Sequence, residues 1–408
     1  MRIDGTTLVS RLRQLGQIGR DEHGRLSRLA ASDADKAGRD LFVHWAEAAG
    51  LDVEIDRIGN IFATLRPASG AGGAPIMVGS HIDTVTDAGI LDGCYGVLAG
   101  LAVVEAIRAS GAEPPAPITV AAFTNEEGVR YAPDMMGSLV YSGAMDAEEA
   151  LAARGSDGTM LGEELARIGY AGDRMAGLTK PRAYIELHIE QGPILEREGV
   201  SIGAVENLQG ISWQRVTVEG MANHAGTTPM SMRRDAGQAA ARAIAFLSDR
   251  MRGGDAATVA TVGCLAFHPN AINVVPGRAT FTVDLRDPDA GRLAEEERIF
   301  RAYLDQLAAG EGVSITVERL ARSEPVIFDP GIVQAIEDAA RNMGRSVRRM
   351  TSGAGHDAQM MARVCPAAMI FVPSRGGISH NPAEHTDEED LVTGATLLLE
   401  VVLRLRAG

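Results

Sequence analysis

The chain has 408 residues, of which 45% are hydrophobic, so it can bury a sizeable core and is long enough for two domains or for one large domain with an insertion. Its formal net charge of -15 argues against a nucleic acid or a membrane surface as a partner, because no basic patch offsets that charge. Widely spaced cysteines, no apolar leader and no run of about 18 apolar residues favour a soluble, cytoplasmic protein.

The first half of the chain alternates between helical and strand-like patterns. Apolar residues recur at helical spacing within residues 5–50, and strand-like stretches follow in DVEIDRIGNIFATL, APIMVGSH and PITVAAFTNEE. Between the last two lies GVLAGLAVVEAIRAS, whose small and aliphatic residues are typical of a buried helix. This order of strand, helix and strand predicts an α/β fold, with a mixed, mostly parallel sheet flanked by helices.

The pattern changes near Gly210. ISWQRVTVEGMA and ATFTVDLRD alternate like strands with one wet face, and DAGQAAARAIAFLSDRM is typical of a helix with Asp235 at its N-cap. The earlier pattern returns in DPGIVQAIEDAARNM and PAAMIFVPS. We therefore expect one domain formed by residues 1–210 and 317–408, with an α+β domain inserted over residues 211–316.

A histidine and three aspartates occupy GSHIDTVTDAGILDGCYG, directly after the apolar run PIMV. Such groups are costly near a core unless they are paired or bound to a cation. An isolated His81 is more often a surface residue than a ligand, but Asp83 can orient its ring and Asp92 can supply an anionic oxygen. Because ligands of parallel sheets collect beyond the carboxyl ends of the strands, the segment predicts a metal site.

Further candidate residues lie near other predicted strands. Glu126 and Glu127 follow an apolar strand in FTNEEG, where neighbouring side chains point to opposite sides, so one carboxylate can bind metal while the other serves as a base. An isolated pair of this kind would more often be solvated, but this one falls near the His81 loop. His188, His380 and His385 are further imidazoles, each of which could be structural.

Several segments, in order and spanning nearly the whole chain, carry a family resemblance: GSHIDTV, LDGCYGVLAG, FTNEEGVRYAPDMMGS, IELHIEQGPILE, NHAGTTPMSMRRDA, SGAGHDAQMM and GGISHNPAEHT. They resemble the hydantoinase/carbamoylase branch of the di-zinc aminopeptidase and aminoacylase superfamily. The resemblance implies metal-dependent hydrolysis of the ureido C–N bond of an N-carbamoyl-L-amino acid, giving the amino acid, ammonia and carbon dioxide. Allantoate amidohydrolase or β-ureidopropionase activity at the same site is the alternative.

The resemblance also implies roles for the candidate residues. Two divalent ions would occupy the site, zinc or manganese, with cobalt and nickel also acceptable to these ligands. His81 and His188 would bind one ion, Glu127 and His385 the other, and Asp92 would bridge them. Glu126 would be the general base that takes a proton from the bridging water, and Asp83 would hold His81.

Substrate contacts are implied in the same way. His224, in the inserted domain, would act across the interface of a homodimer and stabilise the oxyanion of the tetrahedral intermediate. Arg286 shares one face of its strand with Asp284, so it could pair with that carboxylate or anchor a substrate carboxylate. The implied substrate contacts are Arg286, Asn273 and Gln191, and His380 and Gly377 lie close enough in sequence to His385 to line the pocket.

Other classes of protein stay open at this point. An aminoacylase or a dipeptidase would use similar machinery, although EQGP around Gln191 and NHAGTTPM favour the ureido branch. A binding protein without turnover would be plausible if Glu126 or Asp92 were replaced, and both are present. Tyr131 and Ala383 lie where relatives differ, and they leave the substrate class undecided. Closure of the inserted domain over the substrate is a further hypothesis.

Overall fold

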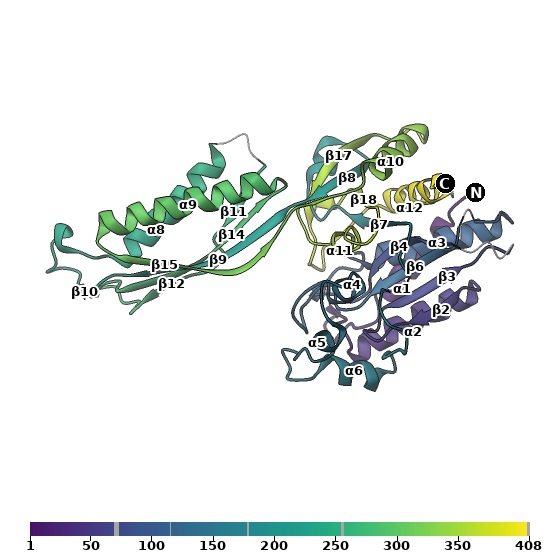
Figure 1. The fold of residues 1–408 in the computed structure, drawn as a ribbon, viewed down its shortest axis with the longest axis horizontal. Helices are drawn as coiled ribbons and strands as arrows, with labels where there is room; N and C mark the ends of the chain where they lie inside the picture. The colour runs from purple at the N-terminus through teal and green to yellow at the C-terminus, as the bar shows by residue number, and fades with distance from the viewer. Residues whose placement is uncertain (69–72, 115, 178, 254–256, 406–408) are drawn as a thin grey trace. The chain divides into compact units, whose positions relative to one another are not determined.

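The computed structural model describes residues 1–68, 73–114, 116–177, 179–253 and 257–405, and the chain divides into two compact units (Figure 1). The first unit comprises Met1–Glu206 and Phe328–Gly408, and the second comprises Asn207–Ile327. Within the described ranges, no helix is both long enough and apolar enough to cross a membrane.

A nine-stranded sheet, most of it in the first unit, has the strand order β16-β8-β18-β7-β4-β6-β3-β2, with β17 paired to β8. The strands are β2 (Asp52–Ile55), β3 (Ile61–Leu65), β4 (Ile76–His81), β6 (Ile118–Phe123), β7 (Ala183–Ile189), β8 (Ile202–Leu208), β16 (Val326–Ile327), β17 (Val347–Ser352) and β18 (Ala367–Val372). Strands β18, β7, β4 and β6 run parallel, and the pairs β8–β18, β3–β6 and β2–β3 are antiparallel. The sheet is therefore mixed with a parallel centre, as the sequence predicts. A separate pair joins β1 (Leu26–Ser27) to β5 (Thr86–Ala88).

The central strands are apolar along their length because both of their faces are covered. Every residue of β4, β6, β7 and β18 is buried, as expected for parallel strands between helices. Helix α3 (Cys94–Ala109) lies very close to the sheet, since a Cβ at Gly96 would be 2.5 Å from the carbonyl oxygen of Leu187. The small residues of GVLAGLAVVEAIRAS thus permit the close approach of helix and sheet.

The other helices of the first unit are α1 (Gly5–Leu15), α2 (Asp33–Ala48), α4 (Met136–Tyr141), α5 (Ala147–Leu151), α6 (Leu161–Ile168), α7 (Ile194–Glu198), α10 (Pro330–Asn342), α11 (Asp357–Met361) and α12 (Glu388–Arg404). The helical pattern of residues 5–50 is divided in the structure. Helix α1 ends at Leu15 and α2 begins after Ser32, whose side chain caps it by accepting a hydrogen bond from the backbone N–H of Asp35. A cap residue of this kind starts a new helix rather than continuing an old one.

The second unit is an antiparallel sheet with two helices on one face (Figure 1). Its strands are β9 (Gly210–Glu219), β11 (Val259–Thr261), β12 (Leu265–His268), β14 (Arg278–Asp287) and β15 (Ser314–Ser323), and a separate pair joins β10 (Asn223–His224) to β13 (Val274–Val275). Its helices are α8 (Ala236–Arg252), capped by Asp235, and α9 (Ala290–Glu311). Phe281, Val283 and Leu285 are buried in the core beneath these helices, so β14 shows the expected alternation.

The second unit is longer than the insertion that the sequence predicts. It begins at Asn207 rather than residue 211, and it ends at Ile327 rather than residue 316. The reason for the later end is β15, which pairs with β9 from Ser314 opposite Glu219 to Ser323 opposite Ile211. A boundary at residue 316 would divide this strand.

Candidate metal centre

Polar side chains gather where the parallel strands end. Strand β4 ends at His81, β7 carries His188 next to its last residue, and Glu126 and Glu127 follow the end of β6. The register aligns these ends, since His81 lies opposite Phe123 of β6 and His188 lies opposite Phe371 of β18. The carboxyl edge of a parallel sheet is where ligands of such folds bind.

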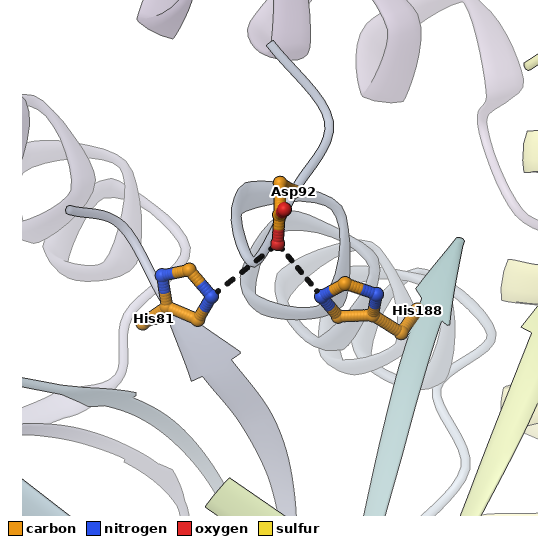
Figure 2. Close-up of side chains that lie close together, drawn as sticks. All are labelled: His81, Asp92 and His188. Carbon is orange, nitrogen blue, oxygen red and sulfur yellow. Dashed lines mark ion pairs between the residues drawn. The ribbon is translucent and has the colours of Figure 1, made fainter. Parts of the chain in front are cut away.

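The first group of candidate ligands is His81, Asp92 and His188 (Figure 2). Asp92 Oδ1 lies between the two rings, 3.6 Å from His81 Nε2 and 3.1 Å from His188 Nε2. The Nδ1 atoms face backbone carbonyl oxygens, that of Asp83 at 3.0 Å from His81 and that of Ile189 at 2.9 Å from His188. A proton on each Nδ1 satisfies these carbonyls and leaves the lone pair of each Nε2 on the side of Asp92, where His188 Nε2 also accepts a hydrogen bond from the Gly93 backbone N–H at 3.1 Å.

The second group of candidate ligands is Asp92, Glu127 and His380. His380 Nε2 is 3.2 Å from Asp92 Oδ2 and 3.5 Å from Glu127 Oε2. Asp92 therefore presents one carboxylate oxygen to each group. This is the geometry of a carboxylate that can bridge two cations.

The structure differs from the sequence prediction in the histidine that joins Glu127. His385, the expected ligand, belongs to no such group among the described residues, and its Nε2 lies 3.1 Å from Asp387 Oδ1. His380, expected to contact the substrate, lies beside Glu127 instead. The cause is a turn in which His380 takes a φ of +52°, in the left-handed region, a conformation that the spacing of the two histidines does not reveal.

Asp83 organises the glutamate loop as well as the His81 segment. Its carboxylate accepts hydrogen bonds from the backbone N–H groups of Glu126 and Glu127, each at 3.3 Å, and it lies 3.7 Å from His81 Nδ1. Glu126 Oε2 is 3.4 Å from His81 Nε2. Strand β6 has ended before these glutamates and Asn125 has a φ of +56°, so strand alternation does not govern them and both carboxylates reach the same cluster.

Burial and crowding shift the pKa values of these groups. Burial raises the pKa of Glu126 well above its ordinary value, and burial together with the charge of Asp92 raises the pKa of Glu127 to about 7. Burial disfavours the charged form of His81, but Glu126 and Asp92 outweigh it and raise the pKa of that imidazole. Burial likewise opposes ionisation of Asp92, yet its hydrogen bonds from His188 and His380 hold its pKa well below the usual range. The cluster thus needs positive charge, from protons or from cations.

The residues fit a pair of divalent cations. Imidazole nitrogens and carboxylate oxygens are ligands that suit zinc and manganese. In addition, Glu127 Oε1 is buried and has no hydrogen-bond partner within the described part of the chain. A buried acceptor without a partner is costly, so a cation beside Glu127 would satisfy it.

Gly93 is required for the packing of His81. Its φ is +65°, and a Cβ at this position would lie 2.4 Å from the His81 ring. We expect Gly93→Ala to destabilise the fold by about 2–4 kcal/mol, because the left-handed conformation and the overpacking each contribute. The matched control is Gly111→Ala, with a φ of +70° and open space around its Cβ, which should cost only about 1–2 kcal/mol. Equal losses in urea denaturation would show that contact with His81 does not matter.

Two residues of the first unit that were expected to contact the substrate have other contacts here. Gln191 Nε2 donates a hydrogen bond to Asp92 Oδ2 at 2.7 Å, while its buried Oε1 has no partner among the residues that the structure places. Gly377 has a φ of +68°, and a Cβ there would lie 2.7 Å from the backbone nitrogen of Pro193. Gly377 thus packs loop against loop, whereas Gln191 touches the cluster directly.

His224, Asn273 and Arg286 all belong to the second unit. His224 is exposed, and its Nδ1 accepts a hydrogen bond from the backbone N–H of Gly226 at 3.1 Å. The backbone carbonyl of Asn273 accepts one from Ala225 N–H at 2.9 Å. Arg286 Nη2 lies 2.9 Å from Asp284 Oδ2, so the pairing that the strand pattern allows is present.

Sequence reasoning assigned no role to His356 or Glu384. His356, in the segment SGAGHDAQMM, is buried with its ring centroid 4.5 Å from that of His188, and burial lowers its pKa well below the ordinary value. Glu384 accepts hydrogen bonds from the backbone of the Asp92 loop. The signal for both was their position within the motifs SGAGHDAQMM and GGISHNPAEHT, since neither residue type reveals burial.

Comparison with known proteins agrees with this geometry. Residues 77–404 match the model of peptidase family M20/M25/M40. The chain is 40% identical to an N-carbamoyl-L-amino-acid amidohydrolase of Rhizobium meliloti, covering 98% of this chain and 96% of that protein. It is 33% identical to an allantoate amidohydrolase of Bacillus subtilis, covering 96% and 95%. The crystal structure of a hydantoinase/carbamoylase family amidase from Burkholderia multivorans superposes with a TM-score of 0.95, at 43% identity over 99% of this chain and 98% of that one.

The chain therefore belongs to peptidase family M20/M25/M40, among its hydantoinase/carbamoylase amidases. It is a hydrolase that acts on amide bonds, as the sequence resemblance implied. The fold and the recognised family are thus confirmed, and the roles of individual residues are proposals that the geometry supports.

Proposed function

We propose that the protein hydrolyses the ureido C–N bond of an N-carbamoyl-L-amino acid, releasing the amino acid, ammonia and carbon dioxide. The observation that carries this proposal is Asp92, whose two carboxylate oxygens face two separate groups of candidate ligands. The relative from Rhizobium meliloti, named for this reaction, supports the choice of substrate class.

The ligand sets follow from the two groups. His81, His188 and Asp92 would hold one cation, and Asp92, Glu127 and His380 would hold the other, with zinc or manganese the best match to these atoms and cobalt or nickel also acceptable. When bound, two such cations supply Lewis acidity to the substrate carbonyl and make an attacking water more acidic. The protein's part is to hold these ligands in place by the sheet and by Asp83.

Glu126 is the proposed general base. Its carboxylate faces His81 at 3.4 Å and its backbone N–H is held by Asp83, so it lies beside the cluster, where it can accept a proton from the attacking water. It then delivers that proton to the leaving nitrogen, which must depart as a neutral amine. Glu127, although adjacent in sequence, faces His380 and has a different task.

Substrate recognition is proposed for Gln191, Arg286, His224 and Asn273. The buried Oε1 of Gln191 would accept an N–H of the ureido group. Arg286 would bind the substrate carboxylate in a bidentate manner, in competition with Asp284. His224 accepts a hydrogen bond at Nδ1, so its proton lies on Nε2, where it can be donated to the oxyanion. Asn273 would be a further substrate contact.

We also propose that the protein is a cytoplasmic homodimer. The second unit would form the interface, and His224 would act in the active site of the partner subunit. Its exposure supports that role, because an exposed imidazole on a short strand is accessible to another chain. The three free cysteines are consistent with a reducing compartment.

The choice of His380 as ligand is tested by a pair of variants. We expect His380→Ala to lower the affinity for one of the two cations by about 10- to 100-fold or more. A residue that only contacts a ligand changes metal affinity by that factor, and a direct ligand should contribute at least as much. His385→Ala should leave both cation affinities unchanged, because its ring lies against Asp387. Calorimetric titration of chelator-stripped protein measures both affinities. The opposite pattern would restore His385 as the ligand.

The substrate class is tested by a panel of compounds. Purified protein with added Mn²⁺ should release ammonia from at least one N-carbamoyl-L-amino acid with a higher kcat/KM than from allantoate or N-carbamoyl-β-alanine. Release from allantoate alone would assign the chain to the allantoate amidohydrolases. Hydrolysis of an N-acetyl amino acid, detected by the freed amine without ammonia release, would contradict the ureido assignment altogether.

A further inference from the structure

Glu384 connects two loops that are remote in sequence. Its Oε1 accepts hydrogen bonds from the backbone N–H groups of Leu91 and Asp92, at 2.8 and 3.2 Å. Its Oε2 lies 2.9 Å from the Ser379 hydroxyl, which donates to it. Glu384 is 8% exposed. One buried carboxylate therefore joins the backbone at Asp92 to the residue that precedes His380.

The His380 loop needs such an anchor. His380 has a φ of +52°, a conformation that residues with a Cβ disfavour, and its side chain is 52% exposed, so neither local preference nor burial holds it. The residues after it form a turn in which Glu384 N–H donates to the Asn381 carbonyl at 3.0 Å. The hydrogen bonds from the backbone of Leu91 and Asp92 to Glu384 fasten this turn to the other loop, beside the contacts of Ser379 and His380 with the Asp92 carboxylate.

The first group of ligands is fixed in a different way. His81 and His188 lie within strands β4 and β7, each is about 1% exposed, and each ring is held by a carbonyl oxygen at its Nδ1. The two strands pair directly from Ile76 opposite Ala183 to Val78 opposite Ile185, so the sheet positions the strands that carry both histidines. Loss of Glu384 should consequently affect the two groups unequally.

We propose that Glu384 is a positioning residue that holds His380 in place for the second cation, the one bound by Asp92, Glu127 and His380. This inference rests on the proposed two-cation site. Glu384 belongs to neither group of candidate ligands, and it would act through Ser379 and through the backbone at Asp92. A residue of this kind commonly changes metal affinity by about 10- to 100-fold.

The test is a titration of chelator-stripped protein with Mn²⁺, followed by calorimetry and by elemental analysis after dialysis. Wild-type protein should bind two cations per chain. Glu384→Ala should bind the cation of Asp92, Glu127 and His380 about 10- to 100-fold more weakly. It should weaken the cation of His81, His188 and Asp92 less, because Asp92 is the one ligand of that group whose backbone Glu384 holds. Ser379→Ala removes the hydroxyl that lies 2.9 Å from Glu384 Oε2 and 3.1 Å from Asp92 Oδ2, the oxygen that faces His380. It should weaken binding of the cation of Asp92, Glu127 and His380, so it decides the question if Glu384→Ala does not fold.

The matched control is Glu337→Ala. Glu337 is a glutamate of the same unit, 6% exposed, whose carboxylate pairs with Arg341 and Arg349 rather than with the cluster. Its loss should lower stability and leave both cation affinities unchanged. Folded Glu384→Ala protein that binds both cations normally, or that loses both equally, would overturn the positioning role. Wild-type protein that binds fewer than two cations would overturn the proposed function itself.

Discussion

Replacing Asp92 with alanine should remove cation binding and turnover together. Asp92 Oδ1 serves the His81 and His188 group and Oδ2 serves the His380 and Glu127 group, so a single substitution takes one ligand from each. The loss also leaves the imidazoles of His81, His188 and His380 without the carboxylate that each of them contacts. Loss of one transition-state contact typically lowers the rate by about 10²–10³-fold. We expect kcat/KM of Asp92→Ala to fall by more than that.

The experiment on Asp92 has a control five residues earlier, in strand β5. Asp87→Asn removes an equal charge, and asparagine tolerates the φ of +57° found at that position. Asp87 belongs to neither group of candidate ligands, so its variant should keep both cations and full turnover. Elemental analysis and ammonia release measure the two properties. Asp92→Ala protein that retained two cations would show that this carboxylate is not shared.

Replacing Glu126 with glutamine should separate chemistry from cation binding. The amide keeps the size of the side chain but cannot accept a proton from water, and general acid–base catalysis typically contributes about 10²–10⁴-fold. We therefore expect kcat to fall by about that factor while both cations remain bound with wild-type affinity. The reason for retention is that Glu126 lies outside both ligand groups, although its Oε2 is 3.4 Å from His81 Nε2.

The neighbouring residue supplies the contrast for Glu126. Glu127→Gln changes the same chemical group one position later, where the carboxylate faces His380. Glu127→Gln should lower the affinity for one cation, so its turnover should recover when the Mn²⁺ concentration is raised. The turnover of Glu126→Gln should not recover. Normal turnover by Glu126→Gln, or recovery of both variants with added Mn²⁺, would contradict the base assignment.

Much of this arrangement follows from the sequence because strand ends are readable. The apolar runs that end at His81 and near Glu126 predict parallel strands, and the carboxyl edge of such strands brings their following residues together. His188 is recognisable for the same reason, since it lies near the end of an apolar strand. Local patterns therefore suffice wherever the sheet itself determines position.

The remaining features depend on turns and pairings that no local pattern encodes. The choice between His380 and His385 is made by a left-handed residue in a loop, and Asn125 has the same effect on the glutamate pair. The end of the second unit depends on the pairing of β15 with β9, a contact between distant segments. Glu384 is visible as part of a motif, but its bonds to Leu91 and Asp92 appear only after folding.

The central claim is that amide hydrolysis requires two cations held around Asp92. The most direct measurement is the rate of ammonia release from an N-carbamoyl-L-amino acid, followed while chelator-stripped wild-type protein is titrated with Mn²⁺ and its cation content is determined in the same samples. Activity should rise with occupancy of the second cation and reach its maximum at two cations per chain. Full activity in stripped protein, or a maximum at one cation per chain, would contradict it.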